Sequence, residues 1–188
     1  LQNEEKREAE IKEHAAQKTE LINPVFFCRK LEEHIGENAI LIGDGGDFVA
    51  TCAYTIKPRG PLTWLDPGPY GTLGIGMGMA IGAKLQRPDA EVWVLFGDGA
   101  AGYSLIEFDT ITRHNIPIIV VVGNDACWRQ IERDQIEVLK DDVGCALSFS
   151  RYDEVAKALG AEGLLVDKAE DVDAVLKKAR ELYAQGKS

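Results

Sequence analysis

Positive charge is scarce in this chain. Its 188 residues include 21 Lys and Arg against 31 Asp and Glu, which gives a formal net charge of −10. Nucleic-acid binding needs clustered basic side chains that neutralise phosphates, so the composition argues against such a partner. A polybasic patch for anionic membrane surfaces is missing as well. An anionic ligand would therefore need a metal ion or helix N-termini to bind here.

Cysteine motifs and long apolar runs are also missing. The four cysteines, Cys28, Cys52, Cys127 and Cys145, form neither a CxxC pair nor a Cys/His spacing typical of zinc sites. Reduced thiols in an intracellular protein are the expected state, although the even count leaves disulfides open. No signal peptide and no apolar run of transmembrane length is found, so we predict no membrane contact by this chain.

The remaining composition is that of one globular domain. Apolar residues make up 45% and charged residues 28%, which is ordinary for such a domain. Residues 1–22 are interpreted as a charged linker or leader, poorly ordered or helical, and Asn23-Pro24 as its boundary with a domain at 23–188. Because the chain opens without an initiator Met, we interpret it as a fragment of a longer protein.

Apolar strands and helical patterns alternate along residues 23–188. Strands are predicted at 39–43, 91–96, 117–122 and 162–166, with a short one near 62–65. Helices are predicted at about 25–35, 46–54, 72–86, 104–114, 129–138, 151–159 and 170–185. The capping-box pattern of Ser104 and Glu107 places the start of one of them. This alternation predicts an α/β fold, a parallel sheet flanked by helices on both faces.

Polar motifs follow two of these strands at the point where each strand ends. Gly97-Asp98-Gly99 comes after the strand 91–96, and Asn124-Asp125 comes after the strand 117–122. Because the carboxyl ends of parallel strands form the ligand-binding edge of an open sheet, the two motifs should meet there. Their side-chain oxygens suit a hard cation such as Mg²⁺ that holds a phosphate ester. Alone, Asp98 could equally be a turn-capping residue.

The order and spacing of the two motifs resemble the thiamine-diphosphate motif, in which GDG is followed further along the chain by NN. The likeness extends to residues 38–48, 64–68, 71–74 and 102–110. Over residues 23–185 the chain is similar to the C-terminal, diphosphate-binding domain of acetolactate synthase-like proteins, in the branch that includes 2-hydroxyacyl-CoA lyases. The resemblance implies the thiamine-diphosphate-binding fold, with thiamine diphosphate and Mg²⁺ as cofactors. It also implies one more strand after Ser188.

The metal ligands implied by the resemblance come from both motifs. They are the Asp98 carboxylate, the Asp125 side chain and the backbone carbonyl of Cys127, whose thiol would be incidental. Asp125 stands where the family usually has the second Asn, so it adds a negative charge that can weaken cofactor binding or tighten the metal. In this register Asn124 braces the turn, whereas a shifted register would exchange the roles of Asn124 and Asp125.

The cofactor contacts implied by the resemblance come from several turns. Backbone N–H groups after Gly99 would bind the diphosphate, and Ala100 replaces a Ser or Thr common in relatives. The Gly71 carbonyl would accept a hydrogen bond from the 4′-amino group of the pyrimidine, and Leu73 would wedge beneath the cofactor and enforce its bent form. The full predicted set of cofactor-binding residues is Gly46, Asp47, Gly71, Thr72, Leu73, Gly97, Asp98, Gly99, Ala100, Ala101 and Asn124.

Two of these segments have a second interpretation. The glycine-rich residues 71–78 also fit a dinucleotide-binding loop, but no clear strand–helix–strand unit begins there. Gly46 and Asp47 also fit an ordinary strand-to-helix turn that Asp47 caps.

The resemblance implies an enzyme that makes or breaks a C–C bond next to a carbonyl, a lyase or carboligase acting on a small 2-oxo acid or a 2-hydroxyacyl-CoA. In the family the activating Glu belongs to a separate pyrimidine-binding domain, usually of the partner subunit. No segment of this chain resembles that domain. We therefore expect no catalytic residue here, no activity of the chain alone, and a homodimer or homotetramer.

Two alternatives stay open. One is a catalytically impaired relative that retains the fold for assembly, which Ala100 and Asp125 motivate. The other is a nicotinamide-binding module. Animal members of the branch are anchored at the endoplasmic reticulum through an N-terminal segment that this chain would lack, so an intracellular location, with or without that anchor, is expected.

Overall fold

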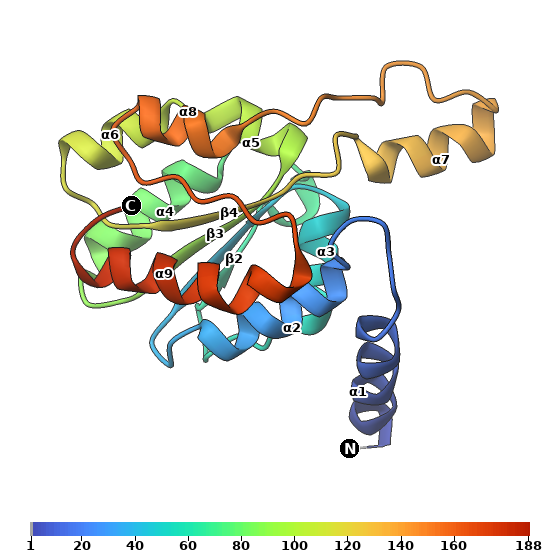
Figure 1. Ribbon diagram of the computed structural model, residues 1–188, viewed down its shortest axis with the longest axis horizontal. Helices are drawn as coiled ribbons and strands as arrows, with labels where there is room; N and C mark the ends of the chain where they lie inside the picture. Colours follow the sequence, from blue (N-terminus) through green and yellow to red (C-terminus); the bar gives the residue numbers. More distant parts are fainter. Residues whose placement is uncertain (1) are drawn as a thin grey trace.

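The computed structural model describes the backbone of residues 2–188 and the side chains of residues 3–188. Its centre is a parallel sheet with the strand order β2-β1-β3-β4 (Figure 1). The strands are β1 (Ile40–Asp44), β2 (Trp64–Leu65), β3 (Val92–Gly97) and β4 (Ile119–Gly123). Because every pair is parallel, the carboxyl ends of all four strands lie at one edge.

Helices cover both faces of the sheet, as the alternation predicts. Side chains of successive strand residues point to opposite faces. Ile42 and Val94 pack in one core, and Leu41 and Trp93 pack in the other. The first core is covered by α4 (Gly76–Gln86), α5 (Asp98–Ser104), α6 (Glu107–Arg113) and α8 (Tyr152–Ala158). The second is covered by α2 (Pro24–His34), α3 (Asp47–Thr55) and α9 (Val172–Ala184).

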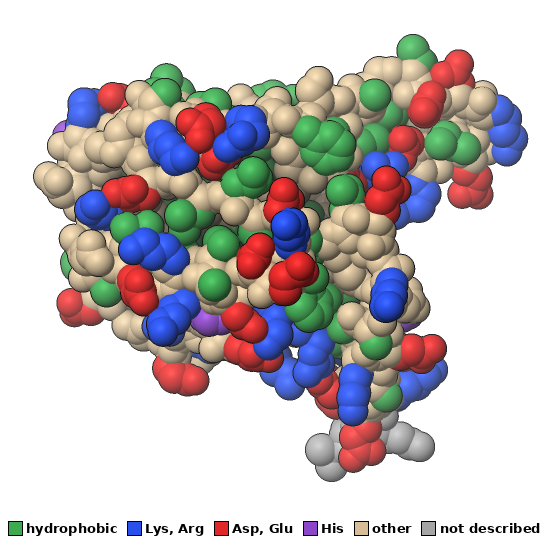
Figure 2. All heavy atoms as spheres, viewed as in Figure 1, with side chains coloured by type: hydrophobic (Ala, Val, Ile, Leu, Met, Phe, Trp, Pro, Cys, Tyr) green, Lys and Arg blue, Asp and Glu red, His purple; other side chains and the backbone are tan. Residues whose placement is uncertain are grey.

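Two helices project from this body. They are α1 (Gln2–Ala15) and α7 (Arg129–Leu139), while short 3₁₀ turns lie at Gly68–Tyr70 and Ala169–Asp171 (Figure 1). Figure 2 shows acidic and basic side chains interspersed on the face in view, and apolar side chains on the projecting α7 arm. The helical form of α1 is one of the two states predicted for residues 1–22. Among residues 2–188, no helix is both long and apolar enough to cross a bilayer.

The predicted helix start at Pro24 is the N-terminus of α2. The Asn23 side-chain oxygen accepts hydrogen bonds from the backbone N–H groups of Val25, at 2.9 Å, and Phe26, at 3.2 Å. Pro24 occupies the first helical position, where its missing N–H costs nothing.

The predicted strand at 162–166 is wrong. The segment has no strand assignment, and its one hydrogen bond to a distant backbone group is from the N–H of Glu162 to the carbonyl of Ser188, at 2.7 Å. Leu164 and Leu165 are 41% and 55% exposed. An apolar run becomes a strand only where a neighbour completes its hydrogen-bond ladder, and no described strand pairs with this segment.

Two predicted helix starts also differ. The helix predicted at 72–86 begins at Gly76, because Gly71 and Gly74 adopt left-handed φ values of 60° and 84° that end any helical path before it. The helix predicted at 104–114 begins at Glu107, as α6, and a separate helix, α5, precedes it. Ser104 ends α5 with its hydroxyl buried and without a hydrogen-bond partner, so the predicted capping box does not form.

Candidate functional site at the carboxyl edge of the sheet

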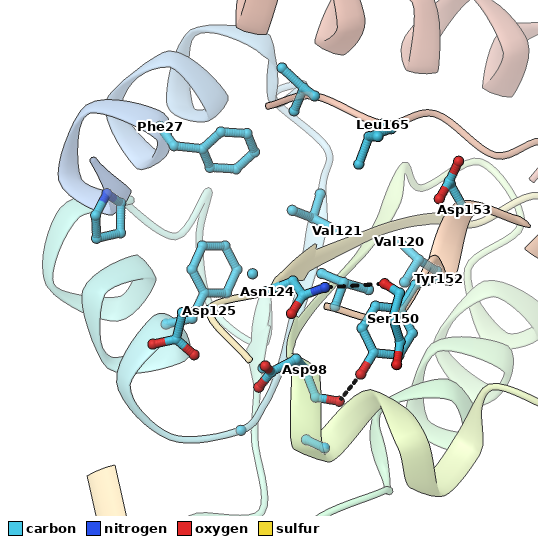
Figure 3. Close-up of a pocket in the computed structure, with 18 of the residues that line it drawn as sticks. Phe27, Asp98, Val120, Val121, Asn124, Asp125, Ser150, Tyr152, Asp153 and Leu165 are labelled. Atoms are coloured by element: carbon cyan, nitrogen blue, oxygen red, sulfur yellow. Dashed lines mark hydrogen bonds between the residues drawn. The ribbon is translucent and has the colours of Figure 1, made fainter. Parts of the chain in front are cut away.

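The strand register brings the turns after β1, β3 and β4 together. Asp44 lies opposite Phe96, and Gly97 lies opposite Gly123, so the residues that follow each strand emerge side by side. A cavity of about 970 Å³ opens there and continues beside β4 as far as residues 163–167 (Figure 3). All the predicted site residues except Thr72 and Ala101 line this cavity.

Asp98 is the most enclosed acidic group of the cavity. It is the first residue of α5 and only 4% exposed. Its Oδ1 accepts the Gly99 N–H at 2.8 Å and its Oδ2 accepts the Cys127 N–H at 3.2 Å. Burial raises the pKa of Asp98 above its ordinary value, and the charge of Asp125 raises it further, against the lowering by these N–H groups. No Lys, Arg or His of the described chain forms an ion pair with it, so this carboxylate lacks a cation.

Asp125 is close enough to raise the pKa of Asp98, but it has a cationic partner of its own. Its Oδ2 lies 2.9 Å from Nε of Arg129, which also pairs with Glu132. The Asp125 and Arg129 side chains are 41% and 45% exposed. The extra negative charge at this position therefore has a cationic partner one helical turn away, which it shares with Glu132.

The two carboxylates do not form a metal site unaided. No group of three or more His, Cys, Asp or Glu side chains suited to a metal occurs among residues 3–188. Mg²⁺ commonly binds through one or two carboxylates and completes its octahedron with phosphate oxygens and water. Asp98 and Asp125 fit that pattern, in which the ion bridges the protein and a bound phosphate.

Asn124 and Cys127 hold the turn after β4. The Asn124 side chain accepts the Ala126 N–H and donates to the carbonyl of Ser150, each at 3.2 Å (Figure 3). Cys127 forms an antiparallel bridge with Ala146. Burial raises the pKa of the Cys127 thiol to about 11, which keeps it protonated at neutral pH. In this geometry the side chain of Asn124 is used within the turn.

Glycines let the turns after β1 and β3 approach each other closely. An added Cβ at Gly45, whose φ is 148°, would lie 2.7 Å from the backbone nitrogen of Gly97. An added Cβ at Gly99 would overlap the ring of Trp128. The resulting surface is backbone rather than side chain, which suits the close approach of a phosphate. The methyl groups of Ala100 and Ala101 face the core, leaving only their backbone for such contacts.

Side chains of α7 reach the turn at Gly46 and Asp47. Both carboxylate oxygens of Asp47 accept hydrogen bonds from the guanidinium of Arg133, at 2.7 Å each. The Gln130 side chain packs on Gly46, where an added Cβ would lie 2.7 Å from Oε1. Asp47 therefore anchors α7 in this structure, a role that the sequence did not indicate.

The turn at residues 71–73 lies at the same edge. Gly71 and Thr72 are exposed, and Leu73 is half-buried against the core beneath the sheet edge. The left-handed φ of 60° at Gly71 fits glycine, which has no Cβ to clash there.

Two residues that the sequence did not single out support this site. Asp44 is fully buried and accepts the N–H groups of Gly74, at 3.0 Å, and Gly76, at 2.7 Å. The Tyr152 hydroxyl donates to the backbone carbonyl of Asp98 at 3.1 Å (Figure 3). The only available signal for Asp44 was an acidic residue at the end of a buried strand, beside Gly45.

Comparison with known proteins gives a consistent result. Residues 44–187 match the family model described as thiamine pyrophosphate enzyme, C-terminal TPP binding domain. The chain is 54% identical over 167 residues to 2-hydroxyacyl-CoA lyase 2 of Mus musculus, covering 88% of this chain but 26% of that protein. It is 36% identical over 184 residues to a probable acetolactate synthase of Mycobacterium bovis, covering 94% of this chain and 34% of that protein.

A solved structure shows the same fold. The thiamine diphosphate-dependent 4-hydroxybenzoylformate decarboxylase of Rhodococcus jostii RHA1 superposes with a TM-score of 0.82 at 20% identity, over 89% of this chain and 32% of that one. At this identity the likeness extends to the fold alone. The chain thus spans about a quarter to a third of the length of each of these proteins.

Proposed function

The chain belongs to the thiamine pyrophosphate enzymes as their C-terminal TPP-binding domain, and we propose that its carboxyl sheet edge holds Mg²⁺ against the diphosphate of that cofactor, thiamine diphosphate. The observation that carries the proposal is the Asp98 carboxylate, which is 4% exposed, has no basic partner in the described chain and stands beside glycine turns. A bound cation would balance its charge. The same ion would attract the diphosphate to an otherwise acidic protein.

In this proposal the metal ligands are the Asp98 carboxylate, an Asp125 oxygen and the Cys127 carbonyl. Arg129 balances the additional charge of Asp125, with 2.9 Å between Nε and Oδ2. An acid at this position is therefore compatible with an anionic cofactor. This compensation favours a functional site over an impaired relative that retains only the fold.

The other end of the cofactor would meet the turn at Gly71, Thr72 and Leu73. The Gly71 carbonyl would accept a hydrogen bond from the pyrimidine amino group, and the half-buried Leu73 side chain would support the cofactor from below. Bound thiamine diphosphate supplies the chemistry for making or breaking a C–C bond next to a carbonyl. The residues of this chain would bind it and orient it, and the metal ion would offset the charge of its diphosphate.

For the whole protein we propose cleavage of a 2-hydroxyacyl-CoA, because identity to a protein of that name is 54%, against 36% for an acetolactate synthase. Condensation of small 2-oxo acids is the competing activity. A pyrimidine-binding domain outside this chain would supply the activating Glu, in a homodimer or homotetramer. The chain alone is then expected to be inactive.

The test is calorimetric titration of thiamine diphosphate into the protein that contains this chain, with and without Mg²⁺. We expect binding that depends on Mg²⁺ and is lost in Asp98→Asn. Asp109→Asn on α6, where Asp109 forms an exposed ion pair with Arg113, is the matched control and should bind normally. Binding of thiamine diphosphate that does not depend on Mg²⁺, or that is unchanged in Asp98→Asn, would contradict the proposed site.

A further inference from the structure

We propose that Asp44 is a positioning residue, which fixes the turn at residues 71–76 relative to the diphosphate motif so that Gly71 and Leu73 meet the pyrimidine end of the cofactor. The inference rests on the proposed function and extends it to a residue outside both motifs.

Asp44 joins the end of β1 to a turn far along the chain. Its Oδ1 accepts the N–H of Gly74 at 3.0 Å, and its Oδ2 accepts the N–H of Gly76 at 2.7 Å. The side chain is fully buried and forms no ion pair with any described residue. A buried carboxylate without a cation is costly, and here both oxygens are used on the backbone of one turn.

The turn has little freedom to move away from Asp44. A Cβ added at Gly76 would lie 3.0 Å from Oδ2 of Asp44 and 2.9 Å from Cε1 of Phe96. On the other side, a Cβ added at Gly74 would lie 2.5 Å from Cβ of Tyr103. The backbone is therefore clamped between Asp44 and Tyr103, at a separation that only glycine permits.

The same contacts continue to the diphosphate motif. The rings of Tyr103 and Trp128 lie with centroids 6.4 Å apart, and Trp128 packs directly on Gly99. Residues 71–76 are thus held at a set distance from Gly99 by side chains on both sides. A cofactor that bridges the two segments needs that distance, because its diphosphate and its pyrimidine must be bound at once.

The chemistry of the two donors requires a carboxylate at this position. Both N–H groups point at the side chain, and both carboxylate oxygens accept. The amide of an Asn would offer one acceptor and one N–H donor, so one buried backbone N–H would face another donor. The turn would then shift to satisfy that group.

The experiment compares two ligands in the protein that contains this chain, thiamine diphosphate and inorganic diphosphate, each titrated in the presence of Mg²⁺. The variants are Asp44→Asn and Gly76→Ala, which disturb the contact from its two sides. We expect each variant to lose about tenfold in affinity for thiamine diphosphate, the loss of one hydrogen bond to a charged group. Affinity for inorganic diphosphate should stay within about twofold, because the diphosphate turns are untouched.

Glu91→Gln is the matched control. Glu91 is also a buried carboxylate that accepts a glycine N–H, from Gly36 at 2.9 Å, but it lies at the opposite edge of the sheet, just before β3. Its substitution should lower stability without changing the ratio of the two affinities. A merely structural role of Asp44 would give the same behaviour as Glu91→Gln and would overturn the inference.

The remaining outcomes are also distinct. An unchanged affinity for thiamine diphosphate in Asp44→Asn would contradict the positioning role of Asp44. An equal loss of affinity for thiamine diphosphate and inorganic diphosphate would contradict it as well. If the unsubstituted protein binds neither ligand, the proposed function fails before the inference is reached. If both variants fail to fold, amide hydrogen exchange is measured in the unsubstituted protein instead. We expect the amides of Gly74 and Gly76 to be protected by their hydrogen bonds to Asp44. Exchange at these amides as fast as that of the exposed Leu62 would contradict the inference.

Discussion

The Oδ2 atom of Asp98 accepts a hydrogen bond from the backbone N–H of Cys127, with 3.2 Å between oxygen and nitrogen. The bond joins the turn after β3 to the turn after β4, although 29 residues separate the two positions. It ties together the two turns at the cavity that Asp98 and Cys127 both line. A metal ion bound by both would therefore find its two turns already fixed, which lowers the cost of ordering them on binding.

The first prediction concerns the glycine at the diphosphate turn. In Gly99→Ala the new methyl group overlaps the ring of Trp128, so we expect a loss of about 1–3 kcal/mol of stability and weaker binding of thiamine diphosphate. Gly102→Ala, in the same helix with open space around the added Cβ, should gain up to about 1 kcal/mol. Urea unfolding and calorimetry measure both effects. Equal behaviour of the two variants would show that the Trp128 contact is not tight.

The second prediction concerns the balance of charge between Asp125 and Arg129. Arg129→Gln leaves Asp125 unpaired near the diphosphate, so affinity for thiamine diphosphate should fall several-fold. Asp125→Asn should change this affinity less. The double variant that carries both substitutions should bind thiamine diphosphate as Asp125→Asn does.

Titration at low and high salt provides the check for this pair. Because both side chains are nearly half exposed, the effect of Arg129→Gln should shrink as salt is raised. If the double variant binds as weakly as Arg129→Gln, Arg129 acts by some means other than neutralising Asp125.

The third prediction concerns Tyr152, whose hydroxyl donates to the carbonyl of Asp98 at 3.1 Å in a partly buried position. Tyr152→Phe should cost about 1 kcal/mol of unfolding free energy, the usual value of one hydrogen bond. The matched control is Tyr70→Phe. Tyr70 is 91% exposed, so removing its hydroxyl should leave the free energy of unfolding unchanged. The midpoints of urea unfolding are compared for the two variants. An unchanged midpoint in Tyr152→Phe would show that this hydrogen bond adds nothing to stability.

The fourth prediction is a pH dependence from Asp153. The hydrogen-bonded guanidinium of Arg151 lowers the pKa of Asp153 from its ordinary 3.8 to about 2. The folded state thus favours the charged form of the Asp153 carboxyl, so the ion pair stabilises the protein above about pH 4. This stabilisation is lost as the pH falls toward 2. We expect a contribution of about 1 kcal/mol, discounted because the Arg151 side chain is 56% exposed.

Urea unfolding at about pH 5 and about pH 3 tests this effect. The protein with Asp153 should lose more stability between these values than Asp153→Asn does. Parallel losses in the two proteins would mean that the ion pair does not form in solution.

The alternation of apolar strands and helices was enough to predict the α/β class and the meeting of Asp98 with Asn124-Asp125 at one edge of the sheet. These features depend on local periodicity and on the rule that parallel strands end at one edge, so nearby residues carry the information. The helix start at Pro24 was predictable for the same reason, since a helix cap is a local hydrogen bond.

Other predictions from the sequence depended on partners that a local pattern does not contain. Leu164 and Leu165 look like part of a strand, but a strand exists only where another backbone pairs with it. Ser104 and Glu107 look like a capping box, but the preceding residues already form α5. In the first case no pairing strand is present among the described residues, and in the second the adjoining helix already includes Ser104.

The sequence by itself thus determined the fold class, the order of the elements and the chemical types at the site. The tertiary structure alone decided that Arg133 pairs with Asp47 and that Asp44 anchors Gly74 and Gly76. The physical reason is the range of the interactions. Periodicity and caps act within a few residues, whereas the contacts of Asp44 and Asp47 join residues 30 to 86 positions apart, which only the packed sheet brings together.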